Sequence, residues 1–541
     1  MSRSDLMARL LRMARLAERC EQTGESPEEA IGRDQPGSEG RRKFAKGVVA
    51  ATTGAAAFSL APGVWADGKR IGMKPVRPRL SGSVAVVGAG IAGLACATEL
   101  SRQGLNARVF EASDRFGGRI ASLRDVFPGQ VVERGGEFIG TSHHTMLGYA
   151  RELGLTLENY ASPAGESFYH FGGGRYSEAQ VVSEYREFAA SIREDIGTLG
   201  APTADSFQPS DATLDYMSIA DYLDLHGAGS LLRRVIGSAY LAEYGAGIDE
   251  LSAISFLRFV HGDQRSQQAP FGVHGGESVR VLEGNDRITS GLAERLPIPA
   301  SLGHRLVSIR KLAGGMLRLS FDAGGRTVDS DHHAVVLTLP FSVLRDVELH
   351  ASLDLPAWKT LAIKSTDMGQ HSKLMLGFNG PVWRDRHGLS GTGFSDQPEL
   401  QATWETNPSR ATADHAVLAG HFGGARAQGI SGGTVQANAA AFLAGLERVM
   451  PGATAAASRD ADGRFVAFAE NWAQNPYSKG SHSTNRPGYF TNTAAHEGKA
   501  VGNLLFGGEH TSSFYEWQGF MEGAALSGLR TAGEVLTLAK A

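Results

Sequence analysis

The chain has 541 residues with a formal net charge of −4, and 42% of its residues are hydrophobic while 20% are charged. This length predicts two or three domains. The near-balanced charge gives no reason to expect a nucleic-acid partner. The sequence contains no run of about 20 apolar residues, so no membrane-spanning helix is expected. Two cysteines, Cys20 and Cys96, are too few for a disulfide framework or a thiolate metal site, and no common metal-binding motif is present, so no metal is expected.

Residues 1–80 are predicted to form a leader and a Pro/Arg-rich linker. Residues 5–20 have the spacing of a short amphipathic helix. Paired arginines in the segment 40–46 (GRRKFAK) precede a weakly apolar stretch that ends near Ala66, which resembles a twin-arginine export signal. A disordered basic tail is the alternative interpretation. The signal predicts a periplasmic or secreted protein, with ordered structure beginning at Ser83.

Residues 84–119 contain the signature of a dinucleotide-binding β-α-β unit. The apolar run Val84–Val87 is typical of a buried parallel strand, and a glycine-rich turn opens the following helix. In such a turn the glycines permit a sharp bend, close approach of a pyrophosphate and tight helix–strand packing, while the helix N-terminus offers N–H groups to phosphates. Glu111 ends the second strand and can accept hydrogen bonds from a ribose. The predicted nucleotide-binding residues are Gly88, Gly90, Ala92, Gly93 and Glu111.

The later elements are predicted in chain order as helices over 145–260, strands over 304–340, a mixed block over 360–465 and a glycine-rich final helix over 518–538. We therefore predict an α/β protein with a discontinuous Rossmann-type domain and an α+β substrate-binding domain that contains a mixed sheet and helices. The predicted boundaries are 83–145, 275–340 and 465–541 for the Rossmann-type domain, and 146–274 and 341–464 for the substrate-binding domain.

Residues 115–119 (RFGGR) resemble the RxGGR motif of the flavin-containing amine oxidase superfamily, which includes monoamine oxidases and L-amino acid oxidases. The resemblance covers nearly the whole chain after residue 83 and implies that the Rossmann-type domain binds FAD, a choice that the glycine motif alone does not make. Gly135–Ile139 resembles the segment beside the flavin, His304–Val307 the strand at the adenine, and Gly507–Thr511 the ribityl-binding turn. The further FAD-binding residues so implied are Ala112, Arg115, Gly118, Arg119, Gly135, Gly136, Glu137, Phe138, Val307, Trp472, Gly508, Glu509, Gly519, Phe520 and Met521.

Two segments near the C-terminus bear on how the flavin is held. Residues 519–523 (GFMEG) resemble the start of the family's final helix, whose N-terminus would stabilise the anion that forms when the flavin accepts a hydride. Residues 472–482 resemble the segment in which monoamine oxidases carry a flavin-linking cysteine. Ser481 stands at that position, so non-covalent FAD is expected.

Three side chains are implied to carry the chemistry. Lys373 resembles the family's lysine, which holds a water against flavin N5 and would assist reoxidation by oxygen; an exposed strand lysine is the alternative. His482 and Phe520 resemble the two walls that frame the amine, with an imidazole in place of one aromatic ring. A loop histidine without a catalytic role is the alternative for His482. His143 and His144 either line the entrance or are solvated.

The resemblance implies oxidative deamination of an amine. Hydride leaves the α-carbon for the flavin, the imine hydrolyses to an aldehyde or ketone plus ammonia, and dioxygen or another acceptor regenerates FAD, giving hydrogen peroxide in the case of dioxygen.

L-amino acid oxidases hold the substrate carboxylate with an arginine. Phe138 stands in its place, which favours an amine, although Arg258, Arg265 or Arg280 could supply that contact. L-amino acid oxidation to a 2-oxo acid is therefore the alternative activity. A flavin desaturase acting on C–C bonds and a non-enzymatic FAD-binding protein are more remote alternatives, and a homodimer is left open.

Overall fold

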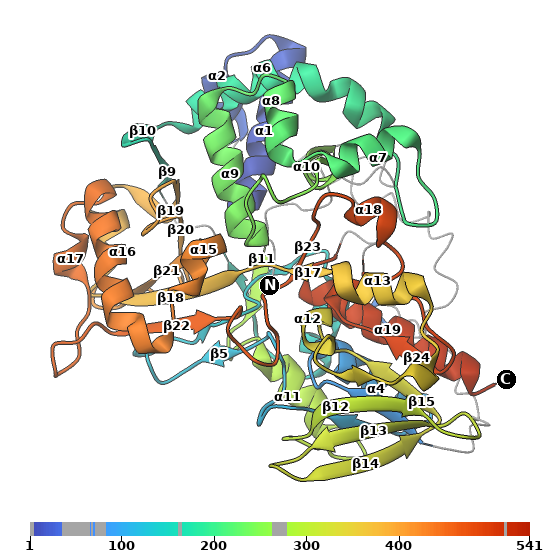
Figure 1. Ribbon diagram of the computed structural model, residues 1–541. Coiled ribbons are helices and arrows are strands. Elements are labelled where there is room, and N and C mark those ends of the chain that lie inside the picture. Colours follow the sequence, from blue (N-terminus) through green and yellow to red (C-terminus); the bar gives the residue numbers. More distant parts are fainter. Residues whose placement is uncertain are drawn as a thin grey trace.

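Figure 1 shows the computed structural model of the chain, which describes residues 5–34, 65–66, 69–70, 83–160, 165–261, 278–512 and 517–540. The twin-arginine segment 40–46 and Arg265 lie outside the described residues. Among the helices that are described, none is both long enough and apolar enough to cross a bilayer. Within the same ranges, no three His, Cys, Asp or Glu side chains form a group that could hold a metal ion.

A four-stranded parallel sheet, in the order β24–β15–β3–β4, forms the base of the Rossmann-type domain. Its strands come from distant parts of the chain: β3 (Val84–Val87), β4 (Ala107–Phe110), β15 (Ala334–Leu337) and β24 (Leu504–Phe506). Val84 and Val86 pack toward the helices α4 (Ile91–Arg102) and α19 (Met521–Leu538). Ala85 and Val87 point to the opposite face. Burial on both faces is what the continuous apolar strands predict.

A second four-stranded sheet covers that opposite face, in the order β14–β13–β12–β16. Its strands are β12 (Arg305–Lys311), β13 (Leu317–Asp322), β14 (Thr327–His332) and β16 (Glu348–Leu349). The register between β12 and β13 shifts between Leu306 and Ser308, which leaves Val307 in a bulge without a strand partner. The bulge adjoins the nucleotide side of the domain, where Leu306 lines the cleft described below.

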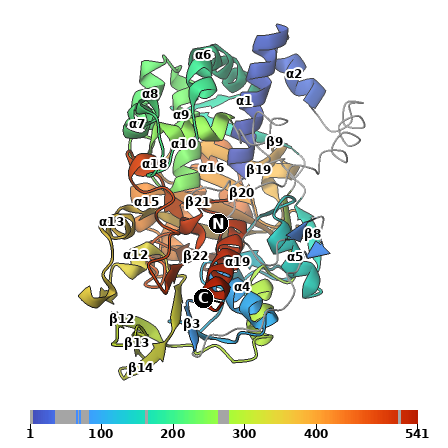
Figure 2. The ribbon, with the colours of Figure 1, turned by 90° about the vertical axis from the view of Figure 1, so that its right-hand side faces the viewer.

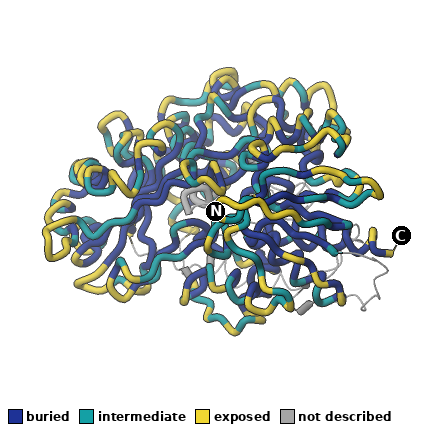
Figure 3. Tube along the Cα trace, turned by 60° about the horizontal axis from the view of Figure 1, so that its bottom comes forward, coloured by how far each residue is buried: buried dark blue, intermediate teal, exposed yellow. Residues whose placement is uncertain are grey.

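A seven-stranded sheet forms the centre of the substrate-binding domain, in the order β10–β9–β19–β20–β21–β18–β22. Its strands are β9 (Glu166–Phe171), β10 (Gly174–Tyr176), β18 (His371–Phe378), β19 (Leu389–Ser395), β20 (Ala402–Glu405), β21 (Ala416–Gly423) and β22 (Ala467–Asn471). Leu374 and Leu376 pack toward α16 (Val435–Val449) on one face. The other face bears His371, Lys373, Trp404 and His421, and is called the site face below. Figure 3 shows that buried residues gather in the interior of the molecule and exposed ones on its outer loops.

The boundary expected at residue 465 is wrong, because β22 belongs to the seven-stranded sheet. It pairs with β18 in an antiparallel register that places Lys373 opposite Glu470. The chain therefore returns to the Rossmann-type domain only after Asn471.

The shorter elements are β1 (Trp65–Ala66), β2 (Lys69–Arg70), β5 (Ser122–Leu123), β6 (Val132–Glu133), β7 (Ile139–Gly140), α5 (His144–Glu152), β8 (Leu157–Tyr160), β11 (Ser278–Val281), α11 (Asp286–Glu294), α12 (Phe341–Leu344), α13 (Ala357–Ser365), β17 (Asp367–Met368), α14 (Val382–Asp385), α15 (Gly424–Gln428), α17 (Ala453–Ala456), β23 (Ser483–Thr484), α18 (Tyr489–Asn492) and η4 (Glu509–Thr511).

Helices form an outer layer above the seven-stranded sheet (Figure 1). They are α6 (Glu178–Thr198), α7 (Pro209–Tyr216), α8 (Ile219–Leu225), α9 (Ser230–Tyr244) and α10 (Ala253–His261). A capping box at Ser177 and Gln180 begins α6. Gly245, which adopts the left-handed conformation at φ 62°, ends α9.

The N-terminal helices α1 (Asp5–Thr23) and α2 (Pro27–Asp34) belong to this layer, and Figure 2 shows α1 beside α6 and α9. Met13, Ala17 and Cys20 are fully buried in the same apolar core as α6 and α9. Arg12 forms an ion pair with Glu178 at the start of α6. The expectation that ordered structure begins at Ser83 is therefore wrong for residues 5–34, because their apolar stripe is part of a domain core.

Candidate active site

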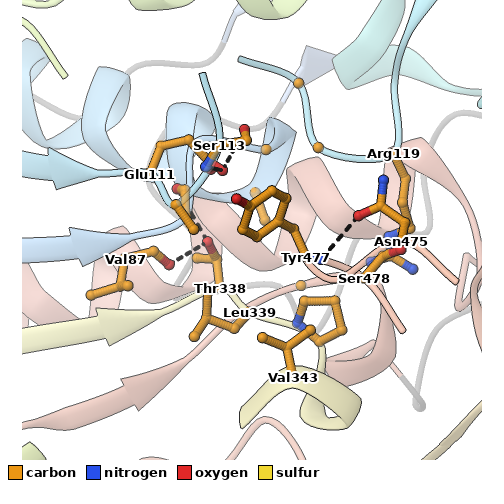
Figure 4. Close-up of a pocket in the computed structure, with 18 of the residues that line it drawn as sticks. Val87, Glu111, Ser113, Arg119, Thr338, Leu339, Val343, Asn475, Tyr477 and Ser478 are labelled. Carbon is orange, nitrogen blue, oxygen red and sulfur yellow. Dashed lines mark hydrogen bonds between the residues drawn. The ribbon is translucent and has the colours of Figure 1, made fainter. Parts of the chain in front are cut away.

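A cleft of about 590 Å³ opens where β3, β4 and β15 end, and Figure 4 shows part of its lining. The carboxyl ends of parallel strands meet at this edge, where open α/β sheets bind ligands. The structure places thirteen of the sequence-predicted residues in the lining: Gly88, Gly90, Ala92, Glu111, Ala112, Arg115, Gly118, Arg119, Trp472, Gly508, Glu509, Phe520 and Met521.

The three glycines of the first turn each meet a different steric demand. Gly88 has φ +107°, and a Cβ there would lie 2.4 Å from the hydroxyl of Thr338. A Cβ on Gly93 would lie 1.9 Å from the carbonyl oxygen of Gly88, so only glycine lets α4 pack this closely on β3. Around Gly90 the nearest atom to such a Cβ is 3.9 Å away, which leaves the backbone open to a ligand. Gly90 caps α4 without a side chain, so the first turn of the helix can donate its N–H groups to phosphates.

Glu111 is held in place while one acceptor position stays open. Its carboxylate accepts hydrogen bonds from the amide of Ala89 (2.7 Å) and from the amide and hydroxyl of Ser113 (2.9 and 2.8 Å). An ionised carboxylate offers about four lone-pair positions. One position therefore remains for a ribose hydroxyl.

The RFGGR loop is fixed by its own arginines. Arg115 donates to the carbonyl of Gly118 at 2.6 Å and so closes the loop on itself. Arg119 donates to the carbonyl of Ser481 (2.6 Å) and forms an ion pair with Glu509 (2.7 Å). The loop thus ties the β-α-β unit to the C-terminal segments. Together with the uncapped helix and the open position on Glu111, this cleft fits an FAD, which these residues would hold.

Gly135 and Gly136 pack elements together and do not line the cleft. A Cβ on Gly135 would lie 1.9 Å from the carbonyl of Arg119, and one on Gly136 would lie 2.7 Å from the sulfur of Met521. The two glycines therefore let their segment lie directly against the RFGGR loop and the start of α19. Met521 and the N-cap residue Phe520 bring the N-terminus of α19 to the cleft.

Lys373 and Glu137 form a buried ion pair between β18 and this glycine segment. The ammonium also donates to the carbonyl of Glu133 at 2.6 Å, and Trp404 donates its indole N–H to the same Glu137 oxygen at 3.1 Å. Both charged side chains are 4% exposed. Lys373 is thus not an exposed strand lysine; two of its three N–H bonds are used, which leaves one for a water or a ligand. Glu137, expected beside the cofactor, instead holds Lys373.

Three imidazoles stack on the site face next to this pair. His371 lies 4.7 Å from His421 and 5.3 Å from His482, measured between ring centroids, and Tyr244 lies 6.2 Å from His482 on the far side. Burial lowers the pKa of His482 to about 4 and that of His421 to about 3, and it lowers the pKa of His371 well below its ordinary value. The stack is therefore uncharged at neutral pH.

His371 anchors the segment that carries Ser481 and His482. Its Nε2 lies 3.0 Å from the carbonyl of Ala242, and its Nδ1 lies 2.5 Å from the hydroxyl of Ser481. A carbonyl can only accept, so the neutral ring carries its proton on Nε2, and Nδ1 competes with the carbonyl of Gly369, 3.0 Å away, for the single hydroxyl proton of Ser481. A serine hydroxyl cannot form a thioether, and Ser481 is consistent with non-covalent FAD.

Phe520 packs against His143, a residue that the sequence left open as either an entrance residue or a solvated one. His143 is buried, accepts from the amide of Gly140 at 3.0 Å, and lies 5.5 Å from Phe520 between ring centroids. His144 is exposed at the start of α5. Sequence reasoning also missed His371, His421 and Trp404. The period-2 alternation of a strand places His371 on the face of Lys373 and could have identified it, whereas the other two become neighbours only through strand register.

The arginines considered for a substrate carboxylate are engaged elsewhere or outside the described residues. Arg280 is buried and donates two hydrogen bonds, at 2.9 and 2.6 Å, to Glu158. Arg258 lies over the ring of Phe490, with 5.4 Å between guanidinium carbon and ring centroid. At position 138 the phenylalanine ring is buried 6.4 Å from the ring of Trp404.

Comparison with known proteins agrees with this architecture. Residues 91–536 match the sequence profile of the family described as flavin containing amine oxidoreductase. The chain is 28% identical over 487 residues to AofH of Mycobacterium tuberculosis, provisionally named a flavin-containing monoamine oxidase, covering 84% of this chain and 96% of that protein.

Human amine oxidase [flavin-containing] B is 24% identical over 482 residues, covering 84% of this chain and 86% of that protein. The solved structure of cyclohexylamine oxidase from Brevibacterium oxydans superposes with a TM-score of 0.71 at 22% identity, covering 85% of this chain and 100% of that one. The profile match spans most of the chain, from the start of α4 through the RFGGR loop into the C-terminal helix. The chain therefore belongs to the flavin-containing amine oxidoreductase family and is an FAD-dependent amine oxidase.

Proposed function

We propose that the enzyme oxidises the carbon–nitrogen bond of an amine that bears no α-carboxylate, and that the imine hydrolyses to an aldehyde or ketone plus ammonia while dioxygen is reduced to hydrogen peroxide. The observation that carries this choice is the charge balance of the site face. The cation on this face, Lys373, is already neutralised by Glu137, and Phe138 offers no charge. A substrate carboxylate would be buried without a partner there, which is unfavourable.

The protein's own residues orient the amine and leave the proton chemistry to the solution. When bound, the flavin supplies the hydride acceptor. His482 would be a weak base, because burial lowers its pKa to about 4, far below that of an alkylammonium ion. The amine must therefore react as its neutral form. Lys373 has one N–H left to hold a water beside the reacting centre.

A screen of matched pairs tests this proposal. Each pair consists of an amine and the L-amino acid that differs from it only by the α-carboxylate, such as phenethylamine and phenylalanine, or cadaverine and lysine. We expect peroxide from at least one amine and at least a hundredfold lower kcat/KM for its amino acid. A reversed preference would establish an L-amino acid oxidase.

Anaerobic bleaching of the yellow protein separates the remaining alternatives. Bleaching by an amine without peroxide formation in air would indicate an acceptor other than dioxygen. A protein that binds FAD but is bleached by no amine or amino acid would favour a C–C desaturase or a non-enzymatic flavoprotein.

We also propose that the protein is exported by the twin-arginine route, since this route suits a protein that folds around its cofactor first. The support is the segment 40–46. Cleavage near Ala66 would separate α1 and α2 from the rest of the chain, yet Met13, Ala17 and Cys20 are buried in the substrate-binding domain. We expect the N-terminal fragment to stay bound after cleavage.

Cell fractionation and mass spectrometry test the route. An exported protein should be extracytoplasmic, and a double Arg41→Lys, Arg42→Lys variant should remain inside the cell. Denaturing mass spectra should show two pieces where native spectra show one particle. Equal retention of the wild-type protein and the double variant in the cytoplasm would overturn the proposal.

A further inference from the structure

One buried carboxylate, Glu509, joins the two segments that carry His482 and Phe520. Its carboxylate accepts a hydrogen bond from the hydroxyl of Ser483 (2.7 Å) and another from the amide of Ser483 (3.2 Å). It also accepts the amide of Gly519 at 3.0 Å. We propose that Glu509 is a positioning residue that fixes the spacing of His482 and Phe520, and that these two rings frame the amine. The proposal rests on the proposed function for the identity of the substrate.

The hydrogen-bond count separates Glu509 from a residue that binds the cofactor. Four donors occupy its carboxylate: the guanidinium of Arg119, the amide and hydroxyl of Ser483, and the amide of Gly519. A carboxylate has about four lone-pair positions, so none remains for a ribityl hydroxyl. Glu111 in the same cleft has three donors and one open position. The ribityl role expected for the Glu509 side chain is therefore replaced by a structural link.

The two linked segments touch each other, so a shift in one is transmitted to the other. Ser483 follows His482 directly, and the carbonyl of His482 accepts the amide of Gly369 at 2.7 Å. Gly519 precedes Phe520 and has φ +87°. A Cβ on Gly519 would lie 3.4 Å from Nδ1 of His482. The spacing of His482 and Phe520 thus depends on where the amide of Gly519 is held.

Glu509 is ionised at neutral pH. Burial alone would raise its pKa, but Arg119 and the neighbouring histidines and hydrogen bonds lower the pKa to about 2. Both oxygens are therefore acceptors at every working pH. A neutral acid or an amide could not serve all four donors.

An amide at this position breaks one side of the link selectively. In Glu509→Gln the amide oxygen should turn toward Arg119, because that hydrogen bond is assisted by charge. The amide nitrogen then faces the hydroxyl of Ser483 and the amide of Gly519. The hydroxyl can rotate and accept, but the N–H of Gly519 cannot. Phe520 is thereby released while Arg119 stays in place.

The experiment compares Glu509→Gln with Glu111→Gln and Ser483→Ala in the full-length holoenzyme. At saturating FAD, we expect Glu509→Gln to raise the KM for the best amine at least tenfold, with kcat changed less than threefold and FAD affinity within threefold of wild type. Glu111→Gln should weaken FAD binding, which Glu509→Gln should not. Ser483→Ala, which removes one of the hydrogen bonds, should give a smaller rise in KM than Glu509→Gln.

Hydrogen–deuterium exchange gives a second measurement that needs no substrate. Glu509→Gln should speed exchange at the amide of Gly519 at least tenfold and leave exchange in β3 unchanged. Weaker FAD binding with unchanged exchange at Gly519 would overturn the inference in favour of a ribityl contact. Wild-type inactivity toward every amine would instead overturn the proposed function, and the exchange data would still decide the role of Glu509.

Discussion

Different kinds of interaction shape the nucleotide cleft and the site face of the seven-stranded sheet. Around β3 close packing decides the residue type: a Cβ would lie 2.4 Å from the hydroxyl of Thr338 at Gly88 and 1.9 Å from the carbonyl of Gly88 at Gly93. On the site face the contacts are made by side chains: an ion pair between Lys373 and Glu137, and three uncharged imidazoles. Steric fit decides the first region, and charge balance with hydrogen-bond count decides the second.

This difference predicts which property each region controls. A change of size in the cleft should abolish cofactor binding whatever the charge of the new residue. A change of charge on the site face should alter stability or turnover while the cleft still binds FAD. Glu509 belongs to both regions, since it lines the cleft yet bonds the segments of His482 and Phe520.

The largest effect is expected at Gly93. In Gly93→Ala the new Cβ would lie 1.9 Å from the carbonyl of Gly88, so α4 must move away from β3. We expect purified protein without yellow colour and with FAD affinity reduced more than a hundredfold, measured by absorbance and fluorescence titration. Gly197→Ala is the matched control, because a Cβ at that position on α6 would meet nothing within 4 Å beyond its own stretch of helix. A yellow Gly93→Ala protein would contradict the steric account.

The next effect is expected at the buried ion pair. Lys373→Met leaves Glu137 charged and buried, and losing one partner of such a pair costs roughly 3 to 5 kcal/mol of unfolding free energy. The double variant Glu137→Gln, Lys373→Met should regain most of that stability in urea denaturation but not the lost rate of amine oxidation. Asp224→Asn, in an exposed pair with Arg233, should change stability by less than about 1 kcal/mol. A double variant no more stable than Lys373→Met would show that charge balance does not govern this face.

The same difference explains which features could be predicted from the sequence. The glycine turn and the RFGGR loop are contiguous, and each residue's steric role follows from its position in the motif. Lys373 was assigned by resemblance, but its partner Glu137 is 236 residues away and was expected beside the flavin. His421 reaches Lys373 only through the register of β18 and β21. Strand register depends on tertiary packing, which a single sequence does not display.

The N-terminal helix was predicted as a helix but not as part of a core. Residues 5–20 show the amphipathic spacing, and α1 covers Asp5–Thr23. The twin-arginine segment that follows it led to the interpretation of the whole stretch as a leader. An amphipathic pattern shows that one face will be covered, but it does not identify the surface that covers it.

The third effect concerns α1 and tests whether its burial contributes to the free energy of unfolding. Met13 is fully buried, so Met13→Ala should lower the free energy of unfolding by roughly 2 to 5 kcal/mol. Gln22→Ala, on the exposed side of the same helix, should change it by less than about 0.5 kcal/mol. Urea denaturation of the full chain measures both. Equal stability of the two variants would show that α1 is dispensable, and would remove the reason to expect its retention after leader cleavage.

The smallest effect is a slope in the pH dependence of stability. The folded-state pKa of His421 is lowered by burial to about 3, below the ordinary value of 6.5, so the unfolded chain binds more protons as pH falls through that window. Stability contributed by the neutral ring is thus present above about pH 6.5 and is lost progressively toward about pH 3. His421→Phe removes the titrating group; Nδ1 of His421 has no hydrogen-bond partner to lose, and the variant gives up the ring's hydrogen bond to the backbone of Ala242. We expect denaturation curves measured from pH 5 to pH 8 to show a shallower acid slope for His421→Phe than for wild type.

Wild-type kcat/KM should show no inflection near pH 6.5, because the stacked imidazoles stay neutral there. An inflection that His482→Phe removes would mean that an imidazole of the site face carries charge during turnover.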